Sequence, residues 1–263
     1  MKRENTMSID SVKKLFDNSS LPQQANDLII NSLNDTSIAG CIGTLVDELE
    51  TDDITIVSII LDSSGSMNQF EQIVIDSYNK FIMSLRESKQ SGSILVSTRS
   101  FDSTQKILHG FKKVDEINPI SGKDYSASGA STSLYDTLMD ALTGAEGYAL
   151  SLVQSGVRVK RIVVVFSDGD DNSSHKVKSI DVKTVSEGLL KSEMTYLVYV
   201  GYQQNQQNQS SDLKKIAAAV GFPNVLTAKA TESEIRRTMD LVSKSIIRKS
   251  QTQITSTNTF FSN

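Results

Sequence analysis

The sequence predicts an α/β protein with a doubly wound, mostly parallel central sheet, one antiparallel edge strand and helices on both faces. Residues 54–61 form a continuous apolar, β-branched run, and the segment 160–169 contains a second one, "IVVVF"; such runs are typical of strands that are covered on both faces. Segments with helical spacing alternate with strand-like segments from residue 52 to residue 248. A chain of 263 residues is long enough for one such domain with additional material.

The first half of the predicted domain contains a strand, a helix and a hairpin. "ITIVSIIL" at 54–61 is the first strand, and residues 70–85 place apolar side chains at three- and four-residue spacing, which predicts an amphipathic helix. Residues 94–101 and 105–111 alternate in polarity and are separated only by "DST", which favours a hairpin. Asp102 in that connection is expected to cap the turn.

The second half repeats an alternation of helix and strand. A polar loop rich in glycine and serine, at about 118–131, leads into a helix at 133–154. "KRIVVVFSDG" at 160–169 then predicts a second interior strand that runs into an acidic turn. The remaining predicted elements are a helix at 180–192, a strand at 195–201, a helix at 211–220, a strand at 224–228 and a helix at 231–248.

Three segments depart from this alternation. Residues 1–51 contain helical-looking pieces and are predicted to form a helical N-terminal extension that packs on the domain of residues 52–248. Residues 249–263 are polar and have no helical period, so we expect a flexible polar tail. The low-complexity run "QQNQQNQ" at 203–209 predicts a mobile surface loop.

Composition excludes several classes of function. The formal net charge is −4, and the lysines form no block, so nucleic-acid binding is not expected. Cys41 is the single cysteine, which rules out an intrachain disulfide and a thiolate zinc cluster, and we expect it to be a small buried hydrophobic residue. No apolar stretch is long enough to span a membrane, and the first residues do not have the pattern of a secretory signal. We therefore expect a cytoplasmic location.

Oxygen-bearing side chains follow the two predicted interior strands. Asp62 ends the first strand, with Ser64 and Ser66 in the turn after it, and Asp168 ends the strand "IVVVFSD". Thr132 lies near the start of the helix between them. Ligands of α/β sheets bind beyond the carboxyl ends of the strands, where these loops would meet. Two carboxylates and three hydroxyls are hard donors, which suit Mg²⁺, Mn²⁺ or Ca²⁺ better than zinc or copper.

These residues resemble the metal-ion-dependent adhesion site of von Willebrand factor A (VWA) domains. Residues 62–66, Asp-Ser-Ser-Gly-Ser, match the D-x-S-x-S motif of that family, and Thr132 and Asp168 match its threonine and its last aspartate. The resemblance covers residues 52–248 in the expected order, and its closest likeness is to bacterial or viral intracellular members. It implies the Rossmann-like fold of the family.

The resemblance also implies roles. Ser64 and Ser66 would bind the cation directly, Thr132 directly or through water, and Asp62 and Asp168 mainly through waters. A cation with mostly neutral ligands keeps an open position, which an Asp or Glu of a partner protein would fill. This implies a non-enzymatic, cation-dependent protein-protein interaction module, with Mg²⁺ as the expected ion and Mn²⁺ or Ca²⁺ as alternatives. Related intracellular domains often work beside AAA+ ATPases, so such an ATPase is one candidate partner.

Other interpretations of the same residues stay open. The 62–66 turn also fits simple capping of the following helix, although that gives no reason for matching loops on separate strands. A haloacid-dehalogenase-type, Mg²⁺-dependent phosphoester hydrolase would need a second carboxylate two residues after Asp62, where this chain has Ser64. A structural or assembly subunit with an idle metal site is a third possibility. Asp170, Asp171 and Asn172 are interpreted as a solvated turn rather than as a second cation site.

Overall fold

A six-stranded sheet forms the centre of the computed structural model, which describes residues 7–169, 171–204, 209–251 and 259–261. The strand order is β3-β2-β1-β4-β5-β6, and every neighbouring pair is parallel except β2–β3. The predicted fold class is therefore confirmed. The strands are β1 (Asp53–Asp62), β2 (Ile94–Phe101), β3 (Gln105–Lys113), β4 (Arg158–Ser167), β5 (Thr195–Gln203) and β6 (Asn224–Lys229).

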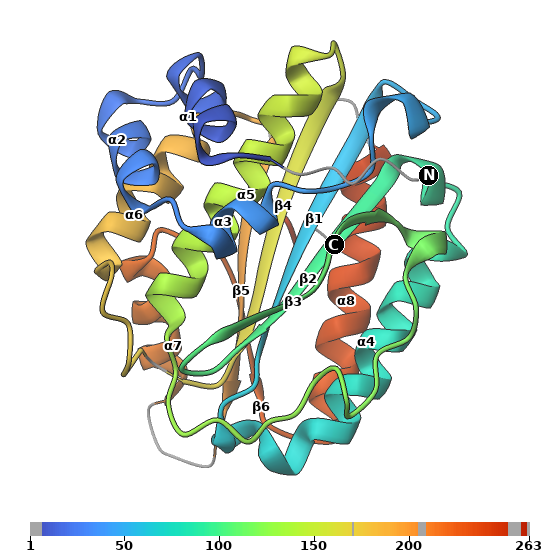
Figure 1. The fold of residues 1–263 in the computed structure, drawn as a ribbon. Helices are drawn as coiled ribbons and strands as arrows, with labels where there is room; N and C mark the ends of the chain where they lie inside the picture. The colour runs from blue at the N-terminus through green and yellow to red at the C-terminus, as the bar shows by residue number, and fades with distance from the viewer. Residues whose placement is uncertain (1–6, 170, 205–208, 252–258, 262–263) are drawn as a thin grey trace.

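Helices cover both faces of the sheet (Figure 1). On one face lie α4 (Glu71–Arg86) and α8 (Glu232–Gln251), and on the other lie α5 (Leu134–Gln154), α6 (Ser179–Leu189) and α7 (Gln209–Ala219). Short 3₁₀ helices occur in the connections, namely η1 (Val46–Glu48), η2 (Gly65–Phe70), η3 (Ser91–Ser93) and η4 (Val114–Glu116).

The apolar run of β1 is continuous because both of its faces are buried. Val57, Ile59 and Leu61 point into the core shared with α4 and α8, whereas Ile56 and Ile60 point into the core shared with α5. Successive side chains of a strand point to opposite faces, so a strand between two helical layers needs apolar residues at every position. α4 buries the stripe that its spacing predicts, including Ile73, Tyr78, Phe81 and Leu85.

Three helices precede the sheet, at α1 (Ile9–Asp17), α2 (Gln23–Ser32) and α3 (Asp35–Gly40). Their apolar faces join the core on the α5 side of the sheet, and Cys41 is fully buried there, as predicted. Gly43 pairs with Phe111 of β3, and Thr44 N–H donates to Phe111 O at 2.8 Å. This segment covers part of the outer edge of the antiparallel strand, which would otherwise present open backbone groups.

The expected flexible tail at 249–263 is wrong in part. α8 continues through Gln251, residues 252–258 lie outside the described structure, and Phe260 is fully buried. Phe260 packs beside Tyr196 with ring centroids 6.1 Å apart, and its N–H donates to Asn224 Oδ1 at 2.9 Å. An aromatic side chain gains about 2–3 kcal/mol from full burial, which helps to offset the entropy lost when residues 259–261 are ordered against the sheet.

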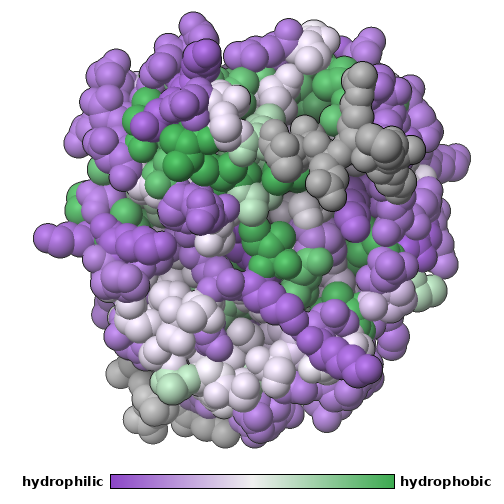
Figure 2. Space-filling view, viewed as in Figure 1, coloured by the Kyte–Doolittle hydropathy of each residue, from purple (hydrophilic) through white to green (hydrophobic). Residues whose placement is uncertain are grey.

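Within the described residues, no helix combines the length and the apolar character that crossing a bilayer requires. Figure 2 shows hydrophobic residues gathered on the upper and middle parts of one face, while the lowest part carries mostly hydrophilic and intermediate residues. The lowest part is the end of the molecule at which β1 and β4 reach the glycine- and serine-rich loops.

Candidate metal centre

The candidate site lies where the strand order of the sheet reverses. From β1 the chain passes to β2 on one side and later returns to β4 on the other side, so the loops after β1 and β4 diverge above neighbouring strands. Such a reversal leaves a crevice at the carboxyl edge, and ligands of α/β sheets bind there. Asp62 is the last residue of β1, and Asp168 directly follows β4.

A chain of hydrogen bonds joins four of the five predicted site residues. Ser64 N–H donates to Asp62 Oδ1 at 2.8 Å, and the hydroxyls of Ser64 and Ser66 lie 3.0 Å apart. The Ser66 hydroxyl in turn donates to Asp168 Oδ1 at 2.9 Å. Asp62, Ser64 and Asp168 are each less than 5% exposed. The structure therefore brings together oxygen donors that are 102 residues apart in the chain.

Thr132, the fifth predicted residue, is held at the same edge by its main chain. Its N–H donates to Asn172 Oδ1 at 2.7 Å, and its carbonyl oxygen accepts from Asn172 N–H at 3.0 Å. The loop before it also meets the Asp62 turn, because Gly65 N–H donates to Gly129 O at 2.7 Å. A Cβ atom on Gly129 would lie 2.2 Å from Asp102 Cβ, so the close approach of Gly129 to Asp102 requires glycine. The three predicted loops thus converge.

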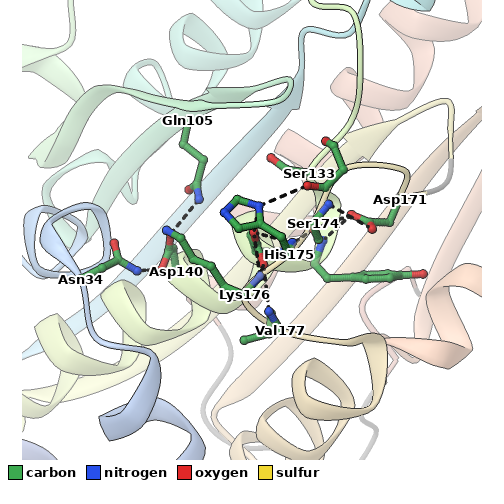
Figure 3. Close-up of polar contacts among 12 residues, drawn as sticks. Asn34, Gln105, Ser133, Asp140, Asp171, Ser174, His175, Lys176 and Val177 are labelled. Carbon is green, nitrogen blue, oxygen red and sulfur yellow. Dashed lines mark hydrogen bonds and ion pairs between the residues drawn. The ribbon is translucent and has the colours of Figure 1, made fainter.

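The turn after Asp168 is a structured one. The carboxylate of Asp171 accepts the Ser174 hydroxyl at 2.5 Å and Tyr135 N–H at 3.2 Å, and Asn172 holds Thr132. Asp136, near the start of α5, accepts the N–H groups of residues 175–177 at 3.0–3.1 Å (Figure 3). These contacts agree with the interpretation of Asp171 and Asn172 as turn residues, and they fix the loop that carries Asp168; Asp170 lies outside the described residues.

Three contributors to the site are not among the predicted residues. The Ser167 hydroxyl donates to Asp62 Oδ2 at 2.5 Å, and the Tyr125 hydroxyl donates to the Asp62 carbonyl oxygen at 2.6 Å. Gln204, directly after β5, donates from its amide to Ser66 O at 2.8 Å and also to Asp168 Oδ2. Ser167 could have been found from the sequence, since it is the last residue of β4 and directly precedes Asp168. Gln204 belongs to the run expected to be a mobile loop, of which residues 205–208 lie outside the described structure.

The electrostatics of the site favour a bound cation. Burial raises the pKa of Asp62 to about 6, although hydrogen bonds from Ser167 and Ser64 oppose this, and the nearby Asp168 raises it further. Burial also raises the pKa of Asp168. Two buried carboxylates so close together are costly to ionise, and a divalent cation would offset that cost.

The kinds of donor also limit the choice of ion. Within the described part of the chain, no three His, Cys, Asp or Glu side chains cluster in a way that could hold a metal ion. A cation at this edge would therefore depend on hydroxyl as well as carboxylate oxygens. Such donors fit Mg²⁺, Mn²⁺ or Ca²⁺. The assignment of Asp62, Ser64, Ser66, Thr132 and Asp168 as ligands stays a prediction.

No protein-family model and no curated protein matches the sequence. Among solved structures, the fold is similar to a D319A mutant of the PilB minor pilin from Streptococcus sanguinis, with a TM-score of 0.55 and 13% identity, covering 77% of this chain and 63% of that one. It is also similar to the pilus adhesin SpaC from Lactobacillus rhamnosus GG in its open conformation, with a TM-score of 0.53 and 12% identity, covering 76% and 30%.

A weaker similarity links the chain to proximal thread matrix protein 1 from the mussel byssus, solved with a zinc-occupied MIDAS motif, at a TM-score of 0.47 and 18% identity, covering 74% and 46%. This last score is too low to support any inference about the present chain. The chain spans less than two thirds of the length of each of these three solved chains. At these identities the similarity concerns the fold, which is an α/β sheet of this type.

Proposed function

We propose that the protein binds a divalent cation at the carboxyl edge of β1 and β4 and, through that ion, an acidic side chain of a partner protein. The supporting observation is the hydrogen-bonded series Asp62–Ser64–Ser66–Asp168, which gathers hard oxygen donors from two loops. Hydroxyls bind a cation without neutralising it, so the ion keeps affinity for an external carboxylate. Mg²⁺ is the best candidate because it needs few protein ligands and retains waters.

Each residue has a distinct task in this proposal. Ser64 and Ser66 would hold the cation with their hydroxyls, and Thr132 would complete the set from the third loop. Asp62 and Asp168 would supply the negative charge, and their carboxylates are already oriented by the hydroxyls of Ser167 and Ser66 respectively. The cation supplies a Lewis-acidic centre that can bind an anionic oxygen.

We assign the protein to binding modules rather than to enzymes. A phosphoester hydrolase of the haloacid-dehalogenase type needs a proton-transferring carboxylate two residues after Asp62. Ser64 stands there, and its hydroxyl lies against Ser66. A serine hydroxyl is not ionised near neutral pH and is a poor general acid or base, so this position is suited to ligation. Nothing in the described structure favours an AAA+ ATPase as the partner.

The first test measures cation binding directly. Titration of the protein with Mn²⁺, followed by electron paramagnetic resonance of the free ion, should reveal one saturable site. Ser66→Ala should weaken that binding because it removes a ligand. Ser167→Ala should also weaken it, by about tenfold or more, because the Asp62 carboxylate loses a hydrogen bond that orients it. Ser84→Ala on α4, whose hydroxyl bonds within its own helix, is the matched control and should bind as wild type does.

The second test asks whether the bound ion accepts a carboxylate. Water-proton relaxation reports the water on bound Mn²⁺, so acetate should lower the relaxation enhancement in a saturable manner, and acetamide should not. An absence of saturable Mn²⁺ binding, or binding that Ser66→Ala leaves intact, would remove the metal site. An enhancement indifferent to acetate would leave a cation site and contradict its role as a bridge.

A further inference from the structure

A cavity of about 410 Å³ lies at the other end of the sheet, far from the candidate metal centre. It is lined by the α1–α2 connection, the second half of α5, the end of α6, and the first residues of β4 and β5. In Figure 1 this is the end at which α1 and α2 lie. Cavities of this volume accommodate small organic molecules.

The floor of the cavity contains a buried ion pair. Arg161 Nε lies 2.5 Å from Glu146 Oε2, and Arg161 Nη2 donates to Glu146 Oε1 at 3.3 Å. The two side chains are only 13% and 6% exposed. A buried ion pair is expensive to desolvate, so its presence at the floor of a cavity points to a role in binding a polar group of a ligand.

Counting donors shows what the Arg161 guanidinium still offers. A guanidinium has five N–H donors. Glu146 occupies the side formed by Nε and Nη2, and Nη1 donates to Val159 O at 3.2 Å. Among the described residues, Nε is taken up by the ion pair and the two hydrogen bonds use one N–H each of Nη1 and Nη2, which leaves one N–H on each of these two nitrogens. Two parallel N–H groups on the end of a guanidinium are the arrangement that binds a carboxylate in a bidentate manner.

Thr195 adds a second polar group without a partner. It is the cross-strand neighbour of Arg161 in the β4–β5 pair, so both side chains point to the same face of the sheet. Thr195 is 5% exposed, and its hydroxyl has no hydrogen-bond partner within the described structure. Buried hydroxyls are normally paired, because an unpaired one costs free energy. Thr195 lines the cavity, and its hydroxyl has almost no accessible surface, so it would have to rotate about the Cα–Cβ bond to meet a ligand oxygen beside Arg161.

The lining of the cavity is part apolar and part polar, and its charged residues carry a net positive charge. Leu21 and Leu150 are partly buried, Leu189 is buried, and Val153 is an exposed hydrophobic residue at 45%. The exposed Lys191 is the remaining charged lining residue, so two cations oppose the single carboxylate of Glu146. Gly188 also lines the cavity, at the point where α2 packs so closely on α6 that a Cβ on Gly188 would lie 2.9 Å from Ala25 Cβ.

We propose that this cavity binds a small molecule with an apolar body and a single carboxylate. The carboxylate would lie on the free end of the Arg161 guanidinium and accept from the Thr195 hydroxyl, with the apolar body between Leu21, Leu150 and Val153. Glu146 stays on the other side of the guanidinium and holds it in place. The N-terminal helices form part of this cavity through Ser20 and Leu21, which gives them a functional role separate from the metal edge.

The test uses the full chain with octanoate as the probe and octanol as a neutral analogue of the same length. Isothermal titration calorimetry should show saturable binding of octanoate that is at least about tenfold tighter than that of octanol, because octanol cannot pair with Arg161. Val153→Asp should weaken octanoate binding by about tenfold or more, because it places a negative charge at the mouth. Ile180→Asp, at a 59% exposed hydrophobic position outside the lining, is the matched control and should bind as wild type does.

Thr195→Val separates binding from folding. Valine has nearly the same shape and removes only the unpaired hydroxyl, so the melting temperature should not fall, while octanoate binding should weaken. Equal affinity for octanol and octanoate, or octanoate binding unchanged in both Val153→Asp and Thr195→Val, would overturn the proposal. Binding should also persist in Asp168→Asn and in chelator, so the fate of the metal centre does not affect this result.

Discussion

Hydrogen bonds orient individual side chains at two positions, the Asp62 carboxylate and the His109 ring. The Asp62 carboxylate accepts from the Ser64 main chain and from the Ser167 hydroxyl, so both of its oxygens are oriented before any cation arrives. His109 is a second case, on the edge strand β3. Its Nε2 lies 3.0 Å from the Tyr78 hydroxyl, and its Nδ1 lies 2.9 Å from Gly110 O. Both rings are held in the space between the sheet and α4.

His109 predicts a pH dependence of stability. Burial lowers the pKa of His109, and the nearby Lys112 lowers it further. The unfolded chain, with a histidine pKa of about 6.5, therefore takes up a proton first as the pH falls. The stability that neutral His109 contributes is fully present above about pH 6.5 and is lost as the pH falls towards the lower pKa of the folded state. In urea unfolding, wild type should lose more stability than His109→Gln between about pH 7.5 and pH 5.5. Parallel pH profiles would contradict this, since groups common to both chains, including Asp62, cancel in the comparison.

At the scale of elements, the packing of α3 on α5 depends on two glycines. A Cβ on Gly144 would lie 2.8 Å from the Gly40 carbonyl carbon and 2.9 Å from its Cα. Both contacts are with backbone atoms, so α3 would have to move. Beside this crossing, Asn34 caps α3 through Thr36 and Ser37 N–H and also donates to Asp140 on α5 at 2.7 Å (Figure 3). The crossing is how the N-terminal helices are fastened to the sheet layer.

Gly144→Ala should therefore destabilise the protein although alanine is the better helix former. The gain in helix propensity is about 1 kcal/mol, and the forced shift of packed backbone costs about 1–3 kcal/mol. We expect a net loss of up to about 2 kcal/mol in the free energy of unfolding, measured in urea. Gly122→Ala is the control, because a Cβ there would contact only Glu71 Oε1, at 3.7 Å, and its stability should be close to that of wild type. A stabilised Gly144→Ala would show that α3 can move freely.

At the scale of the whole molecule, the N-terminal helices and the segment around Phe260 pack on the same central sheet. The N-terminal helices extend the core on one face, and Phe260 completes the core on the other, against β5 and α8. Arg248 of α8 donates to the Phe260 carbonyl oxygen at 3.1 Å, so this segment is fixed by polar contacts as well as by its ring. The candidate metal centre and the cavity around Arg161 lie at opposite ends of the same sheet.

Phe260 should accordingly contribute to global stability. Phe260→Ala should lower the free energy of unfolding by about 3 kcal/mol, which is the lower end of the range for a fully buried phenylalanine. Phe261→Ala is the matched comparison, because Phe261 is only partly buried, and it should cost clearly less. Thermal and urea unfolding of both variants would measure the difference. Equal and small losses would mean that the segment does not support the fold in solution.

Local sequence patterns determined the strands, the helices and the classes of side chain at the metal edge. The continuous apolar runs of β1 and β4 and the helical spacing of α4 are set by near neighbours in the chain, so they can be recognised without a structure. The convergence of Asp62, Ser64, Ser66 and Asp168 at one edge could be predicted as well, because each stands at the end of an interior strand or in the turn that follows one.

Only the tertiary structure decided the contacts made across the sheet. By sequence Gln204 belongs to a polar loop, but in the structure it lies at the end of β5 and contacts Asp168. Phe260 belongs by sequence to a polar tail, but in the structure its ring packs beside Tyr196. The cavity around Arg161 has no signal in sequence, because its lining comes from five separate segments. Local periodicity records which face of an element is buried, whereas a site assembled from distant segments depends on how those elements pack, which no single stretch of sequence contains.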